Sequence, residues 1–184
     1  MTRGTFYIIL QKKNSFQLVS SCEFNGSMYF ENYGGIAINI LERIVSFKEF
    51  KTYLQKFNDM TFKYEGKLIY PERMGKFLKH IDNGIFIDLK AEMKWTNKEG
   101  HKCTFPMFSS DWQFFKNLST RLVGLKTKDG QLYILKPNEQ VALSYGYMDE
   151  GLYTSLEHGK EVHKCQESNI EEFNIILNDL KKVA

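Results

Sequence analysis

Proline, arginine and cysteine are all scarce in this chain of 184 residues, which has three prolines and three cysteines. The cysteines, Cys22, Cys103 and Cys165, are odd in number and widely spaced. Disulfide-rich secreted domains need paired cysteines, so this pattern excludes such a framework and favours a reducing cytosol. No apolar run approaches the roughly 18 residues of a membrane span. The first residues lack the layout of a signal peptide, and we therefore expect a cytoplasmic protein without membrane contact.

The net charge of the chain is also small. The net charge is +3 and the isoelectric point is about 8.6, with lysine and glutamate mixed along the chain. Dedicated nucleic-acid binders concentrate Lys and Arg on one face, and this balance is too mild to predict one. Lys, Asn, Ile, Phe and Tyr are frequent, which indicates an AT-rich coding genome and weakens any interpretation of the aromatics as a binding signature.

The common catalytic motifs are missing. The chain has no Walker A loop, no G-x-G-x-x-G, no H-E-x-x-H and no G-x-S-x-G. An N-terminal Thr2, exposed by removal of Met1, would be a nucleophile with its own amine as base. Many ordinary chains begin Met-Thr, however. The absence of these motifs favours a non-enzymatic protein and leaves enzymatic activity open.

Hydrophobic patterning predicts strands at residues 5–10, 16–24, 85–96, 101–108, 122–127, 131–135 and 141–156, the last range holding two, and a strand pair or extended segment at 61–70. Most of them adjoin in hairpins, and Asp129-Gly130 predicts a type I′ turn in one. Helical spacing predicts helices at 36–45, from 46 to 57, from 71 to 81, from 110 or 111 to 122, and from 168 to 180. Ser46 with Glu49 forms a capping box for the second helix.

Together these elements predict one α+β domain over residues 1–184, with a mainly antiparallel sheet built of hairpins and packed by three to five helices. No internal repeat and no domain boundary is visible.

Two copies of the tripeptide His-Lys-Cys provide a candidate metal site. On a strand, residues two apart share a face, so each copy offers an imidazole and a thiolate to one side. The four ligands, which suit tetrahedral zinc, are His101, Cys103, His163 and Cys165. About 60 residues separate the copies, far more than usual zinc spacings, so two half-exposed strands are the alternative.

Aromatic side chains crowd two loops punctuated by glycine. Tyrosine gives a large contact area at low entropic cost, so these loops suit a protein interface. Their rings would also stack a nucleobase, with Arg3 beside the first loop, or would fold back into the core. The candidate binding residues are Arg3, Phe24, Met28, Tyr29, Phe30, Tyr33, Tyr145, Tyr147 and Tyr153.

The first 35 residues resemble small proteins of phages and prophages. Those proteins open with Thr-Arg-Gly, run through two strands and reach an aromatic loop, Asp-Gly-Tyr-Pro…Gly, before a helix. Residues 2–4 match the opening, while 25–29 and 33–35 stand where the loop would be. Asn25 replaces the Asp, and the Pro is missing. The resemblance implies a mobile-element origin; the family has no established activity.

We therefore expect a non-enzymatic interaction protein of phage or prophage origin, for example an inhibitor of a host defence or regulatory protein. A small-ligand (nucleotide) binding protein and a zinc-dependent domain are the alternatives. A host protein is the expected partner, with a nucleotide or nucleic acid as the other candidates, and the sequence leaves the oligomeric state open.

Overall fold

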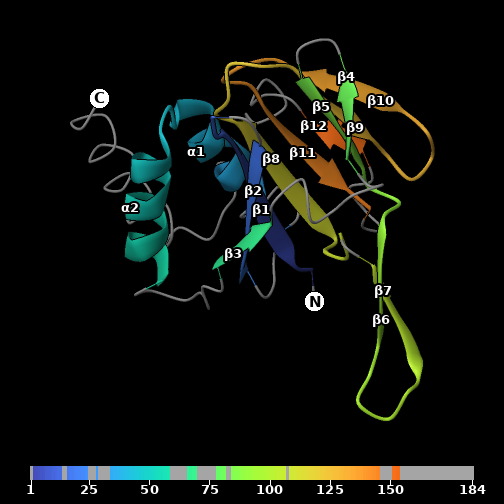
Figure 1. Cartoon of the computed structure of the whole chain (residues 1–184). Helices are drawn as coiled ribbons and strands as arrows, with labels where there is room; N and C mark the ends of the chain where they lie inside the picture. Colours follow the sequence, from blue (N-terminus) through green and yellow to red (C-terminus); the bar gives the residue numbers. More distant parts are fainter. Residues whose placement is uncertain are drawn as a thin grey trace.

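A computed structural model of the chain shows three sheets and two helices in the residues that the structure describes (Figure 1). These residues are 2–13, 16–24, 28, 34–58, 66–69, 78–81, 84–106, 108–145 and 151–153. The helices are α1 (Gly35–Arg43) and α2 (Phe47–Asn58). The predicted helix at 168–180 lies outside the described residues.

The largest sheet has six strands in the order β12-β11-β8-β1-β2-β3. Its central strands, β1 (Gly4–Gln11) and β8 (Trp112–Asn117), run parallel, and every other pairing in the sheet is antiparallel. The flanking strands are β2 (Phe16–Phe24), β3 (Gly66–Ile69), β11 (Gln140–Ser144) and β12 (Gly151–Tyr153).

A second sheet has four strands in the order β10-β9-β5-β4, with β5 and β9 parallel. Its strands are β4 (Leu78–Ile81), β5 (Gly84–Asp88), β9 (Val123–Lys126) and β10 (Leu132–Leu135). The third sheet is the antiparallel hairpin of β6 (Glu92–Thr96) and β7 (Lys102–Pro106).

Alternation along β1 separates two hydrophobic cores. Phe6 and Ile8 belong to a cluster shared with α1 and α2, whereas Tyr7 and Ile9 belong to one shared with the second sheet. Strand β8 divides in the same way, with Phe114 on the helix side and Phe115 on the other. The order of layers is therefore helices, six-stranded sheet, four-stranded sheet (Figure 1).

The predicted fold class is wrong in its helices. Strand predominates in the described residues, which hold only two short helices where three to five were predicted. Residues 112–117, expected in a helix, form the central strand β8, and the end of the expected helix at 71–81 forms β4. A strand buried on both faces shows no alternation, so its apolar spacing mimics that of a helix.

Asp111 has a different role from the predicted helix cap. Its carboxylate accepts a hydrogen bond from the Arg3 backbone N–H at 2.9 Å. Its carbonyl accepts another from the Tyr145 N–H, also at 2.9 Å. Asp111 thus joins the chain entering β8 to both neighbouring strands.

The long strand expected at 85–96 is interrupted. Asp88 ends β5 in a turn, where its carboxylate accepts from the Lys90 N–H at 2.9 Å and its carbonyl accepts from the Ala91 N–H at 3.1 Å. Leu89 and Ala91 are still buried, so the apolar alternation continues through the turn while the chain leaves the sheet.

Several local predictions are confirmed. The β1–β2, β6–β7 and β9–β10 hairpins and the β11–β12 pair all form, and α1 lies within a residue or two of its predicted bounds. The predicted type I′ turn is wrong, because Gly130 alone of the pair has a positive φ, 89°. The Gly130 N–H donates to the Thr127 carbonyl at 3.1 Å, and one left-handed residue after such a turn is a common hairpin closure.

The capping box at the start of α2 is confirmed in both directions. Ser46 Oγ accepts from the Glu49 N–H at 3.3 Å, and Glu49 Oε2 accepts from the Ser46 N–H at 3.0 Å. Each bond satisfies a backbone donor that the helix itself leaves unpaired.

We expect Ser46→Ala to lower the free energy of unfolding by about 1 kcal/mol, because the Glu49 N–H then loses its acceptor. Thr52→Ala is the matched control, since Thr52 is exposed within the same helix and its hydroxyl only donates to the Lys48 carbonyl. Urea denaturation followed by circular dichroism measures both. Equal losses in the two variants would show that the cap contributes nothing particular to α2.

Candidate functional site

The β6–β7 hairpin extends away from the rest of the molecule as an arm (Figure 1). We call residues 92–106 the β-arm. Nearly every described side chain in it is exposed or half-buried, and its two strands pair only with each other. An isolated two-stranded hairpin is only marginally stable in water, so an arm of this kind is more readily explained by binding than by stability.

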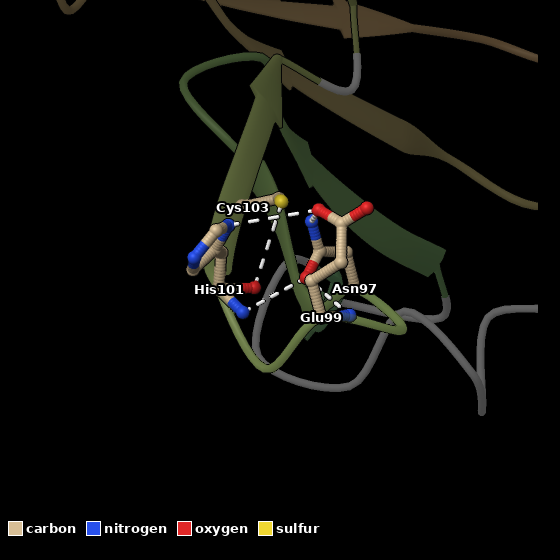
Figure 2. A network of polar contacts seen from close by, with 4 residues as sticks. All are labelled: Asn97, Glu99, His101 and Cys103. Atoms are coloured by element: carbon tan, nitrogen blue, oxygen red, sulfur yellow. Dashed lines mark hydrogen bonds and ion pairs between the residues drawn. The ribbon is translucent and has the colours of Figure 1, made fainter.

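The turn of the β-arm is fixed by its own polar groups (Figure 2). Asn97 Oδ1 accepts from the backbone N–H groups of Glu99 and His101, at 3.0 and 2.8 Å. Asn97 Nδ2 donates to Glu99 Oε2 at 3.2 Å, and Gly100 supplies the left-handed conformation with φ of 83°. The tip is therefore shaped before any partner arrives.

Trp95 is the most informative side chain on the β-arm, with 44% of its surface exposed. It lies opposite Cys103 in the ladder, and Met93 lies opposite Phe105. Residues that lie opposite each other on paired strands share a face, so Trp95 and Cys103 lie together on one face of the β-arm, which we call the apolar face. Lys94 and Thr104, another pair, occupy the polar face.

The β-arm and its base carry an excess of positive charge. Residues 90–106 contain four lysines and two glutamates, a difference of +2 out of a total net charge of +3. The lysines recur every fourth residue, at 90, 94, 98 and 102. Lys94 Nζ lies 3.8 Å from Glu92 Oε2, and both side chains are more than half exposed, so this ion pair leaves them accessible.

The predicted zinc ligands His101 and Cys103 lie near each other at the tip (Figure 2). The Cys103 thiol donates to the His101 carbonyl at 3.6 Å, and His101 Nδ1 is 3.8 Å from Glu99 Oε2. Within the described ranges, no group of three or more His, Cys, Asp or Glu side chains is arranged to hold a metal. His163 and Cys165 lie outside those ranges, so the zinc hypothesis stays a prediction.

The first aromatic loop contributes one described side chain, Met28, which is fully buried in the core on the helix side. Its N–H donates to Thr2 Oγ1 at 2.9 Å, giving the Thr2 hydroxyl a structural partner. Arg3 is exposed. Phe24 ends β2, and Tyr29, Phe30 and Tyr33 lie outside the described residues.

The second aromatic cluster borders a cavity of about 280 Å³. Tyr145 lines it, and Lys128 Nζ lies 5.0 Å from the centre of the Tyr145 ring. Tyr153 instead packs its ring 5.4 Å from that of Trp112. Tyr147 lies outside the described residues. Two separate features thus emerge, the β-arm and this cavity.

Lys116 is a buried cation that the sequence analysis missed, because residues 112–122 were predicted to be helical. It is 0% exposed at the end of β8, and its ammonium donates to the Asn138 carbonyl at 2.7 Å and to Gln140 Oε1 at 3.2 Å. Burial lowers the pKa of Lys116 to about 8, with Glu42 and Glu139 opposing the shift. Its hydrogen bonds connect β8 to the turn before β11, which is a structural role.

Comparison with models of known protein families, with curated proteins and with solved structures finds no match to this chain. Neither α1 nor α2, the helices of the described ranges, is long and apolar enough to cross a membrane. Indications of function therefore come from the geometry of the molecule itself.

We expect Lys116 to make stability rise between about pH 8 and pH 10.5. The unfolded lysine keeps its proton up to about pH 10.5, whereas the folded one loses it near pH 8, so alkaline pH in this window favours the folded state. Below pH 8 both forms are charged and the contribution is constant.

Thermal and urea denaturation of wild type and Lys116→Met across this range measures the effect. Relative to the variant, wild type should gain up to about 1 kcal/mol per pH unit. Lys94→Met, which removes an exposed positive charge, is the control. Parallel pH profiles for wild type and Lys116→Met would contradict the assignment.

Proposed function

We propose that this chain is a non-enzymatic interaction protein that docks its β-arm onto another protein. The observation that carries this proposal is Trp95, a large aromatic side chain left 44% exposed on a two-stranded arm that extends from the body (Figure 1). Tryptophan is enriched among the few residues that dominate binding energy at protein interfaces. The outer edges of β6 and β7 also present unpaired backbone groups within the described sheet, which suits strand addition by a partner.

Charge favours an acidic partner over a second copy of this chain. Two β-arms placed side by side, each with its base, would each bring an excess of two positive charges over residues 90–106, and like charges oppose such pairing. An acidic protein surface would instead attract the positively charged β-arm at longer range, while Trp95 on the apolar face becomes buried in the contact. Nucleic acid is disfavoured, because two net charges neutralise few phosphates and the apolar face would find no counterpart.

The origin of the partner rests on the sequence. Resemblance of the first 35 residues to small phage and prophage proteins supports a partner from the host cell, such as a defence or regulatory protein that this chain inhibits in the host cytoplasm. The buried polar groups support a non-enzymatic role, because the Lys116 ammonium and the Thr2 hydroxyl both serve structural hydrogen bonds.

Photo-crosslinking from the β-arm tests the proposal. The full-length protein carries p-benzoyl-phenylalanine at position 95 or, as a control, at position 96 on the opposite face of β6. We expect a host protein to be captured from position 95 and not from position 96. That protein is then purified for binding measurements with the unmodified chain.

In those measurements, Trp95→Ala should weaken binding about 30-fold or more, the effect of losing an interface hot spot of about 2 kcal/mol. Thr96→Ala, which alters an exposed neighbour on the opposite face of β6, should leave the Kd within about 2-fold. Equal Kd values for the two variants, or capture of nucleic acid at position 95, would contradict docking of a protein by the Trp95 face.

A further inference from the structure

Strand β10 is an edge of the four-stranded sheet within the described residues, apart from the β-arm, and it is independent of the proposed function (Figure 1). Two of the four large hydrophobic side chains that are exposed in this part of the chain lie on it, Leu132 at 57% and Ile134 at 40%. Tyr133 and Leu135 alternate with them and belong to the core between the sheets. Leu132 and Ile134 therefore share the outer face of the sheet, which is open to solvent at this strand.

The backbone groups of the same two residues point outward from the sheet edge. The Thr127 N–H donates to the Gln131 carbonyl at 2.8 Å, which makes these residues a bonded pair of the β9–β10 ladder. Bonded and non-bonded pairs alternate along an antiparallel ladder, so the next bonded residue on β10 is Tyr133. The N–H and C=O groups of Leu132 and Ile134 accordingly point away from β9.

Hydrogen bonds on the other side of β9 give the same direction. The Leu122 and Lys126 carbonyls, just before β9 and at its end, accept from the N–H groups of Ile85 and Leu89 at 3.1 and 3.0 Å. The even-numbered backbone groups of this strand are thus used by the β5 side. Its odd-numbered groups, including the Thr127 N–H, face β10.

The edge at β10 lacks the devices that usually protect such strands. Exposed edges are commonly blunted by charge, by proline or by a bulge, because they otherwise pair with another chain. β10 has the sequence Leu-Tyr-Ile-Leu and pairs regularly with β9. β4, the other edge of the same sheet, carries Lys79 and His80. The outer edge of β10 is therefore suited to accept a further strand.

This edge is complementary to itself when two copies run antiparallel. With Tyr133 of both copies at the two-fold axis, Leu132 of one lies opposite Ile134 of the other, and each such pair exchanges both backbone hydrogen bonds. Their side chains form apolar cross-strand pairs on the outer face. The exposed Asp129 before the strand comes beside the exposed Lys136 after it, whereas in-register parallel pairing would bring like charges together.

We propose that two copies of this chain associate through β10 and join their four-stranded sheets into one continuous sheet. The new ladder pairs the outward backbone groups of Leu132 and Ile134 and buries their side chains against each other. A strand of four residues gives a small interface, so the dimer is weak, with a Kd on the order of 10–100 μM. The β-arms take no part in this contact and stay available to another partner.

Analytical ultracentrifugation of the full chain from about 1 to about 500 μM tests the proposal, because this range spans the expected Kd. The average mass should rise with concentration from that of a monomer toward that of a dimer. Leu132→Lys places a charge between the apolar side chains and should weaken association at least about 10-fold. Val45→Lys is the matched control, since Val45 is 59% exposed between α1 and α2, and its Kd should stay within about 2-fold.

Amide exchange resolved by residue separates strand pairing from any other contact. The amides of Leu132 and Ile134 should become protected as the protein is concentrated, because only the dimer gives them acceptors. Those of Tyr133 and Leu135 should be protected at every concentration, because they bond to β9. Alternation of this kind is expected only when a strand is added at the outer edge of β10.

Three results would each overturn the proposal. The first is sedimentation as a monomer at every concentration up to about 500 μM. The second is association that Leu132→Lys leaves intact, and the third is a dimer in which the Leu132 and Ile134 amides stay unprotected. Trp95→Ala should leave the Kd of the dimer unchanged, and loss of self-association in this variant would place the contact on the β-arm instead.

Discussion

The parallel pairing of β1 with β8 is the constraint on which the rest of the structure depends. Both strands lie in the middle of the six-stranded sheet and place large apolar side chains on both of its faces. Neither face tolerates water, so helices must cover one and a second sheet the other. The ring centres of Phe6 and Phe114 lie 5.0 Å apart in a stacked pair on the helix side, and those of Tyr7 and Phe115 lie 4.8 Å apart in a stacked pair on the other side.

This constraint also determines what remains exposed. Because β5 belongs to the second layer, the chain must leave that sheet after Asp88 and return to the central sheet at β8. The β-arm occupies this connection, and it is thereby positioned by two rigid layers while contributing to neither. The cavity arises at another junction of the layers, where the β9–β10 turn of one sheet meets the end of β11 in the other.

Sequence reasoning succeeds where the signal is local. The Ser46–Glu49 box and the hairpins at 5–24 and 122–135 depend on neighbours in the chain, and all three form, although the turn type of the second hairpin differs from the prediction. It fails at β8, where Trp112 and Phe115 have the spacing of a helix but belong to opposite faces of a strand. One partner of strand 112–117, β1, lies about a hundred residues upstream and the other, β11, lies downstream, and no local pattern reports either of them.

The candidate sites, too, could be predicted only where the signal is local. The His-Lys-Cys tripeptide at 101–103 draws attention to the β-arm, but exposure of Trp95 follows from the break at Asp88 and cannot be predicted from alternation. Tyr145 is noticeable for its aromatic neighbours, whereas the cavity that it lines together with the β9–β10 turn results from packing of distant segments. Aromatic crowding thus locates Tyr145 without indicating its chemistry.

We propose that the doubly covered sheet supports a β-arm that is free to bind. Amide hydrogen exchange of the isolated protein tests this claim most directly, because protection reports local opening against global unfolding. Amides of β1 and β8 should exchange most slowly, at the rate of global unfolding, and those of the β-arm much faster through local opening. Equal protection of the β-arm and β1 would contradict the account, since it would show that the arm is already covered in the free protein.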